Sequence, residues 1–489
     1  MHFAKAIVLR SAVLGLAVLL GSAGVAFGAD EVLGTHFKSC KDDPEVARRV
    51  AQYQAAGEAV TIADIRTPEM PDQENAVVEL RKAASLLRVH GKEVSAWLRY
   101  DMGDRGLPMT SKERSFAHQA SRENANVVPL FDEAMGKKGF CWPTQMSSPL
   151  IDVQLSDLSP QRDLANFLDM DAVLQHDQGD DASVLSDISR LLFLERALDH
   201  HPPVYIVALV AGGTRKVACD TMRKIASTLN IGKGPNAASP TELAELIHQL
   251  LDESELTQSY RTSLFGERVM YMDTADAITN DRMDISKLGA PNQPVAPPGF
   301  TPSQMSGLLK SSIQFDLPIA LDNATAAGEA VTCSDWTSAQ KKLSTAHDEL
   351  DKDVTKHLFA GIMMPSFRRG VLICFRTKAS SRSAAVALAV RWYQEEHGDA
   401  LPPTLEALVP KYLPAVPADP FGVNNAPLRY VAADPDPKVY ALCPDGTDNG
   451  GQDHDANGKW LSSEHMSPTI FHFRQQPRDL SDLPADLKD

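Results

Sequence analysis

The sequence has few cysteines and little positive charge. It contains six cysteines in 489 residues. None stand in C-x-x-C spacing, so redox motifs and zinc ribbons are excluded. Lysine and arginine number 48 against 64 aspartates and glutamates, a formal net charge of −16. This acidity disfavours nucleic acid and anionic lipid as partners. With 43% hydrophobic residues, the chain can still bury more than one core.

Local signatures of enzymes are also lacking. The chain has no G-x-S-x-G, H-E-x-x-H, P-loop or G-x-G-x-x-G motif. Ser338 and Lys341 have S-x-x-K spacing, but the companion S-D-N and K-T-G motifs are absent. The pair His200-His201 could bind a metal, although histidines before two prolines are typical of a helix end. We therefore expect no catalysis, and the alternative is an exported hydrolase whose active site is dispersed along the chain.

Residues 1–28 have the pattern of a secretory signal peptide. Lys5 and Arg10 precede an apolar core at 12–20, and small residues allow cleavage after Gly28. The apolar stretch is shorter than the roughly 20 residues of a membrane span. We expect a periplasmic or otherwise exported protein with no stable membrane span after signal removal, and a retained anchor is the alternative. In an oxidising compartment the six cysteines either form disulfides or stay as buried thiols.

Residues 30–375 predict a mainly α domain of irregular helical hairpins. Ser239-Pro240-Thr241-Glu242 has the form of a capping box with proline at the first helical position. A proline-rich loop at 290–302 interrupts the domain. The helical pattern resumes after Thr337 and ends near Gly398, a typical C-cap. Apolar residues recur at helical spacing, for example Val184, Ile188, Leu191, Leu192 and Leu198.

Residues 376–475 predict a small α+β domain, which is followed by a polar tail at 476–489. The segment 401–409 is typical of a helical turn that starts at proline. The short apolar segments 428–431 and 439–442 are joined by a connection with prolines and aspartates. They therefore favour a β-hairpin.

An acidic loop in this second domain is the most specific motif of the chain. Its residues 453–464 fit the pattern D-x-[DN]-x-[DN]-G-x5-E through Asp453, Asp455, Asn457, Gly458 and Glu464. Alternating carboxylate and amide oxygens with a glycine at the turn suit Ca²⁺. We predict a structural calcium held by Asp453, Asp455, Asn457 and Glu464. The alternative is a solvated acidic loop without metal. Prolines and glycines before the loop exclude the entering helix of a paired EF-hand.

The order of elements in the last part of the chain resembles a known family. The segments that carry this order are 403–414 (PTLEALVPKYLP), 419–422 (DPFG), 427–430 (PLRY), 440–442 (YAL) and 444–446 (PDG). Together they resemble the C-terminal domain of type II secretion major pseudopilins, over roughly the last 110 residues. The resemblance implies that the terminal acidic loop holds a structural calcium. It also makes Asp445 and Asp448 competitors of the four motif residues as ligands.

The start of the chain departs from the pseudopilin pattern. Its apolar segment lies far from the pseudopilin-like domain and lacks the Phe and Glu that follow the cleaved glycine in such leaders. We therefore do not expect the chain to polymerise. The whole architecture resembles uncharacterised exported envelope proteins of planctomycete-like bacteria. The resulting hypothesis is an envelope protein with a calcium-stabilised domain that acts through protein partners in the cell envelope.

Overall fold

The structure is a computed structural model that describes residues 39–88, 107–232, 234–288, 301–352, 357–364, 366–452 and 469–475. It is mainly helical, with one small antiparallel sheet. The strands are β1 (Arg429–Val431), β2 (Lys438–Tyr440) and β3 (Ile470–His472). The α-helices are α2 (Pro44–Ala55), α3 (Ala76–Leu86), α5 (Ser111–Glu123), α6 (Val127–Met135), α7 (Leu158–Asp177), α8 (Asp181–Asp199), α9 (Tyr205–Ile225), α10 (Pro240–Leu251), α11 (Ser254–Thr279), α12 (Pro302–Ala330), α13 (Trp336–Lys352), α14 (Leu358–Met363) and α15 (Phe367–Glu396).

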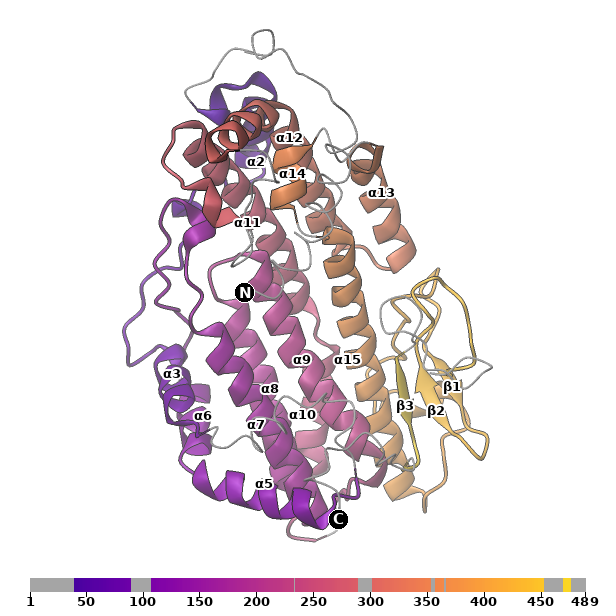
Figure 1. Cartoon of the computed structure of the whole chain (residues 1–489). Coiled ribbons are helices and arrows are strands. Elements are labelled where there is room, and N and C mark those ends of the chain that lie inside the picture. The colour runs from indigo at the N-terminus through magenta and orange to yellow at the C-terminus, as the bar shows by residue number, and fades with distance from the viewer. Residues whose placement is uncertain are drawn as a thin grey trace.

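The helices form an elongated bundle with the sheet on one side (Figure 1). Helix α9 packs against α7, α8, α11 and α15, so it lies at the centre of the bundle. Helix α11 packs along α12, and α13 and α14 pack against α12. The sheet lies against α15, which contacts β2 and β3. Helix α15 therefore joins the helical bundle to the part of the chain that carries the sheet and the acidic loop, residues 397–475. We call this part the tail, as distinct from the polar tail predicted at 476–489.

Helix α10 shows how local sequence specifies these elements. The Ser239 hydroxyl oxygen accepts the N–H groups of Thr241 and Glu242 at 3.2 and 3.5 Å, and Pro240 occupies the first helical position. These contacts satisfy backbone donors that the helix itself leaves without a partner. The apolar face that follows is buried, as the sequence predicted, through Leu243, Leu246, Ile247 and Leu250.

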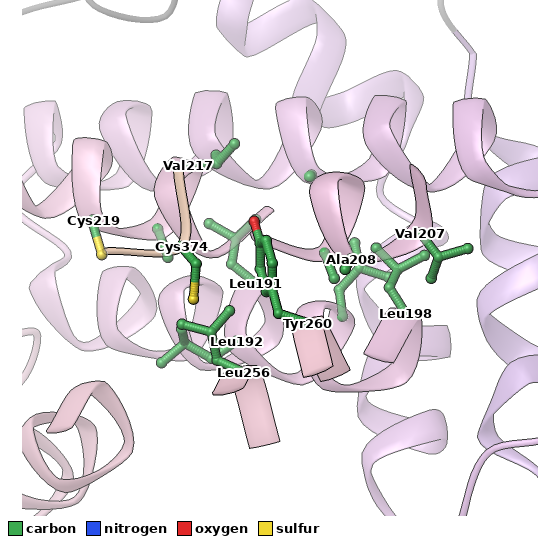
Figure 2. Packing of buried hydrophobic residues seen from close by; sticks show 14 of the residues in the cluster. Leu191, Leu192, Leu198, Val207, Ala208, Val217, Cys219, Leu256, Tyr260 and Cys374 are labelled. Carbon is green, nitrogen blue, oxygen red and sulfur yellow. The ribbon is translucent and has the colours of Figure 1, made fainter. Parts of the chain in front are cut away.

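The core is continuous from the helical bundle into the tail. The predicted apolar stripe of α8 is fully buried, and Leu191 and Leu192 lie near Tyr260 of α11 and Cys374 of α15 (Figure 2). Apolar residues of the sheet, such as Val439 and Phe471, belong to the same cluster. The domain boundary predicted at 375/376 falls inside α15.

The tail has the predicted hairpin and one further strand. Strands β1 and β2 are antiparallel, with Tyr430 opposite Val439. Helix α15 ends at Glu396, and Gly398 has a φ of +62°, as expected of a C-terminal cap. The sequence did not predict β3, which adds to the other edge of β2. A mainly α fold with a small α+β part is thus confirmed. Its pseudopilin-like character stays a prediction.

Several predicted segments lie outside the described residues. These are the signal peptide, the polar tail and the proline-rich loop up to residue 300. Pro302 is the first residue of α12, where Thr301 and Gln304 form a capping box. In the described part of the chain, one helical stretch, Leu358–Glu396, could cross a membrane by length and composition alone. A core helix has the same composition, and α15 packs against α9, α10 and α12.

Candidate functional site

The described part of the acidic loop begins with a tight turn after β2. The N–H of Gly446 donates to the carbonyl of Cys443 at 2.8 Å, and the N–H of Cys443 donates to the carbonyl of Thr447 at 3.2 Å. Gly446 has a φ of +82°, a conformation that favours glycine. Within this turn, Asp445 Oδ1 accepts the N–H of Thr447 at 2.9 Å. Asp445 therefore shapes the turn.

Asp448 fastens the loop to the sheet. Its Oδ1 accepts the Tyr440 hydroxyl at 2.9 Å and the N–H of Gly450 at 3.0 Å. Its Oδ2 accepts Arg429 Nε at 3.1 Å. Burial opposes ionisation of Asp448, but Gly450, Tyr440 and Arg429 outweigh it and lower the pKa of this carboxyl. Asp448 is therefore held as a carboxylate by residues of β1, β2 and its own loop.

A second contact holds the loop just before the calcium motif. Lys438 Nζ, on β2, donates to the carbonyl of Gly451 and to Asp436 Oδ2, both at 2.8 Å. Gly451 has a φ of +62°, and a Cβ there would lie 2.7 Å from Cδ1 of Tyr440. Only glycine fits this position. We refer to Asp448, Lys438, Arg429 and Tyr440 as the loop clasp.

Of the two predicted sets of calcium ligands, the structure describes only the pair Asp445 and Asp448. Asp453, Asp455, Asn457 and Glu464 lie outside the described residues. Within the described ranges, no group of three or more histidine, cysteine, aspartate or glutamate side chains could hold a metal ion. Of the competing pair, Asp448 has two donors on Oδ1, which fills that oxygen's lone pairs. Asp448 thus anchors the loop through this oxygen, and its role as a calcium ligand stays a prediction.

Other candidates from the sequence have structural partners. The Ser338 hydroxyl donates to Asp335 Oδ2 at 2.9 Å near the start of α13. His200 Nδ1 lies 2.9 Å from the carbonyl of Arg196 at the end of α8. His201 is buried, and burial lowers its pKa to about 4. Its Nε2 lies 3.2 Å from the Thr144 hydroxyl. The contacts of His200 and His201 therefore agree with the interpretation of this pair as residues at a helix end.

Three of the cysteines are buried thiols of the helical bundle. Cys40, Cys219 and Cys374 are free and buried. Burial raises the pKa of Cys219 and of Cys374 to about 11. A thiol must ionise to act as a nucleophile. These residues are therefore part of the core.

A buried ion pair between α8 and α9 is also structural. Arg215 Nη1 lies 3.2 Å from Glu195 Oε2, and both side chains are almost inaccessible. Arg215 Nη2 donates to carbonyls at the end of α10, among them that of Leu250 at 3.1 Å. Burial raises the pKa of Glu195, and Arg215 opposes this rise. Arg215 thus caps α10 and joins it to α8.

One constellation that the sequence did not indicate has the geometry of a catalytic triad. His176 lies in the last turn of α7, Asp181 begins α8, and Thr228 ends the short helix η4 (Ala226–Thr228). His176 Nδ1 lies 2.5 Å from Asp181 Oδ1, and His176 Nε2 lies 2.9 Å from Thr228 Oγ1. Each residue on its own is an ordinary helix-end residue. Only the docking of η4 brings the hydroxyl to the imidazole.

Comparison of the chain with models of known protein families, with curated proteins and with solved structures gives no match.

Proposed function

We propose that this protein is an exported cell-envelope protein that acts through protein partners and whose tail is stabilised by calcium. The loop clasp supports this proposal. It fixes the chain to the sheet up to Gly451, directly before the residues with calcium-ligand spacing. A loop that starts from a fixed point loses less conformational freedom when it closes around an ion.

The helical bundle supplies the surface for partners in this proposal. A net charge of −16 disfavours nucleic acid and anionic membrane surfaces, and it leaves proteins as the expected partners. Helix α15 couples the two parts, because it packs against the central helix α9 and against β2 and β3. Calcium bound in the tail would therefore stabilise the fold that carries this surface.

Cross-linking in the native envelope tests the proposal. The wild-type chain and Asp453→Ala would be expressed with the natural leader, fractionated and cross-linked with and without chelator. We expect both chains in the exported fraction, and we expect specific partners that wild type captures better in calcium than in chelator. A cytoplasmic chain, or no specific partner in either buffer, would contradict the proposed function.

A further inference from the structure

The constellation of Thr228, His176 and Asp181 meets the geometric requirements of nucleophilic catalysis. A triad needs a hydroxyl within hydrogen-bond reach of a base, and that base must be oriented by a third group. Both contacts are present in the required order, hydroxyl to Nε2 and Nδ1 to carboxylate. If the imidazole is neutral and Nδ1–H donates to Asp181, Nε2 is left as the acceptor of the Thr228 proton.

The orienting carboxylate is fixed by its surroundings. Asp181 is 2% exposed, and its Oδ2 accepts the N–H of Asn230 at 2.7 Å. The turn between α7 and α8 is closed by Gly179, whose φ is +79° and whose N–H donates to the His176 carbonyl at 2.9 Å. The backbone therefore holds the base and its carboxylate together without help from a ligand.

Thr228, the candidate nucleophile, is accessible to solvent, whereas the side chains of His176 and Asp181 are largely buried. Thr228 is exposed, while Asp181 is buried and the His176 side chain is 9% exposed. Among the residues that the structure describes, the Thr228 hydroxyl has one other acceptor, the Ile225 carbonyl at 3.3 Å, which is more distant than His176 Nε2.

We propose that Thr228, His176 and Asp181 form a nucleophilic triad that hydrolyses carboxylic esters. Thr228 Oγ1 attacks the ester carbonyl carbon while its proton passes to His176 Nε2. The carbon–oxygen bond to the alcohol breaks, and the leaving oxygen takes the proton from Nε2. Water then attacks the acyl–threonine ester, gives one proton to Nε2, and releases the acid as Thr228 recovers its proton. Asp181 stabilises the imidazolium and keeps its proton position fixed.

Hydrolysis of p-nitrophenyl acetate by the purified chain tests this inference. Thr228→Val removes the hydroxyl at an exposed position at nearly constant volume, and Thr228→Ser keeps the hydroxyl. We expect Thr228→Val and His176→Gln to lower the rate roughly 100-fold, because general-base catalysis contributes about 10²–10⁴-fold. We expect Thr228→Ser to retain the activity. Mass spectrometry of the wild-type chain, quenched during turnover, should place the acetyl group on Thr228.

Matched controls separate catalysis from the background reactivity of surface groups. Thr332 is an exposed helix-end threonine whose hydroxyl donates to the carbonyl of Glu329 at 2.8 Å, and His200 is an exposed helix-end histidine. Thr332→Ala and His200→Ala should hydrolyse the ester as fast as wild type. A rate that Thr228→Val leaves unchanged, or an acetyl group on other residues only, would overturn the inference. A purely structural role would change the melting temperature of His176→Gln without changing the rate of Thr228→Val.

Discussion

The side-chain oxygen Oε1 of Glu267 accepts the backbone N–H of Tyr205 at 3.0 Å, so α11 caps the first turn of α9. Both residues are buried. The preceding residue, Gly266, packs against the carbonyl of Pro203 and leaves no room there for a Cβ. The start of the central helix therefore depends on two adjacent residues of α11.

Removal of this cap is expected to destabilise the fold. Glu267→Ala leaves a buried N–H without its acceptor, which costs about 1–3 kcal/mol. Glu267→Gln keeps a carbonyl oxygen for Tyr205 and should lose less. The control is Glu255→Ala, because Glu255 forms an exposed pair with Arg196 and such pairs contribute about 0–1 kcal/mol. Urea unfolding measures the difference, and equal losses for the two alanine variants would contradict the capping role.

The same carboxyl predicts a pH dependence of stability. Burial raises the pKa of Glu267 to about 7, and the N–H of Tyr205 only partly offsets this rise. Its pKa in the unfolded chain is near the model-peptide value of about 4.3. Between these values the folded chain holds a proton that the unfolded chain has lost. The contribution of Glu267 to the free energy of unfolding is fully present below the pKa of the unfolded chain. It decreases by about 1.4 kcal/mol per pH unit as the pH rises from that value to the pKa of the folded chain.

The measurement is urea unfolding from pH 5 to pH 7.5 for wild type and Glu267→Gln. Wild type should lose stability across this range. The variant should lose less, because its carboxamide does not titrate. Other buried carboxyls with raised pKa values, such as that of Asp199, contribute equally to both proteins. Parallel profiles would show that Glu267 does not titrate as described.

A pair of glycine variants tests the packing around α9. A Cβ at Gly266 would lie 1.8 Å from the carbonyl oxygen of Pro203, whereas a Cβ at Gly213 would meet nothing within 4 Å. Gly266→Ala should therefore destabilise the protein by about 1–3 kcal/mol or more, because backbone must move. Gly213→Ala should stabilise it by up to about 1 kcal/mol through helix propensity. Melting temperatures by circular dichroism report both effects, and shifts of the same sign would be inconsistent with this packing.

The loop clasp makes a prediction that separates the two calcium ligand sets. Asp448→Asn breaks the contact with Arg429 but leaves the motif residues intact, so calcium should still raise the melting temperature, by a smaller amount. Asp453→Asn should abolish the rise. The reverse result, in which only Asp448→Asn abolishes it, would assign the ion to the set that the pseudopilin resemblance implies.

Local patterns explain which parts of the fold could be predicted. The stripe of α8 and the cap of α10 depend on residues within a few positions, and the structure has both. Strand β3 was missed because no short turn links it to its partner strand, whereas β1 and β2 are neighbours in the chain. It pairs with β2, which lies 30 residues earlier. The domain boundary was predicted from the change between long helical patterns and short elements. That change does not reveal that α15 packs against both parts.

The site was harder to predict than the fold. The acidic spacing at 453–464 is a local signal, and its interpretation as a calcium site stays a prediction. The clasp residue Lys438 gave no such signal, because its contact with Gly451 requires the folded hairpin. Likewise, Thr228 lies 52 positions from His176 in the sequence. Tertiary packing alone joins them.

Calorimetric titration of calcium into the full chain, after treatment with chelator, is the decisive test of the calcium site. We expect one bound ion for wild type and no binding heat for Asp453→Ala. As a control, Asp399→Ala removes an exposed carboxylate that pairs with Arg391, and it should bind as wild type does. Absence of binding to wild type, or unchanged binding to Asp453→Ala, would contradict a calcium site built on the acidic loop.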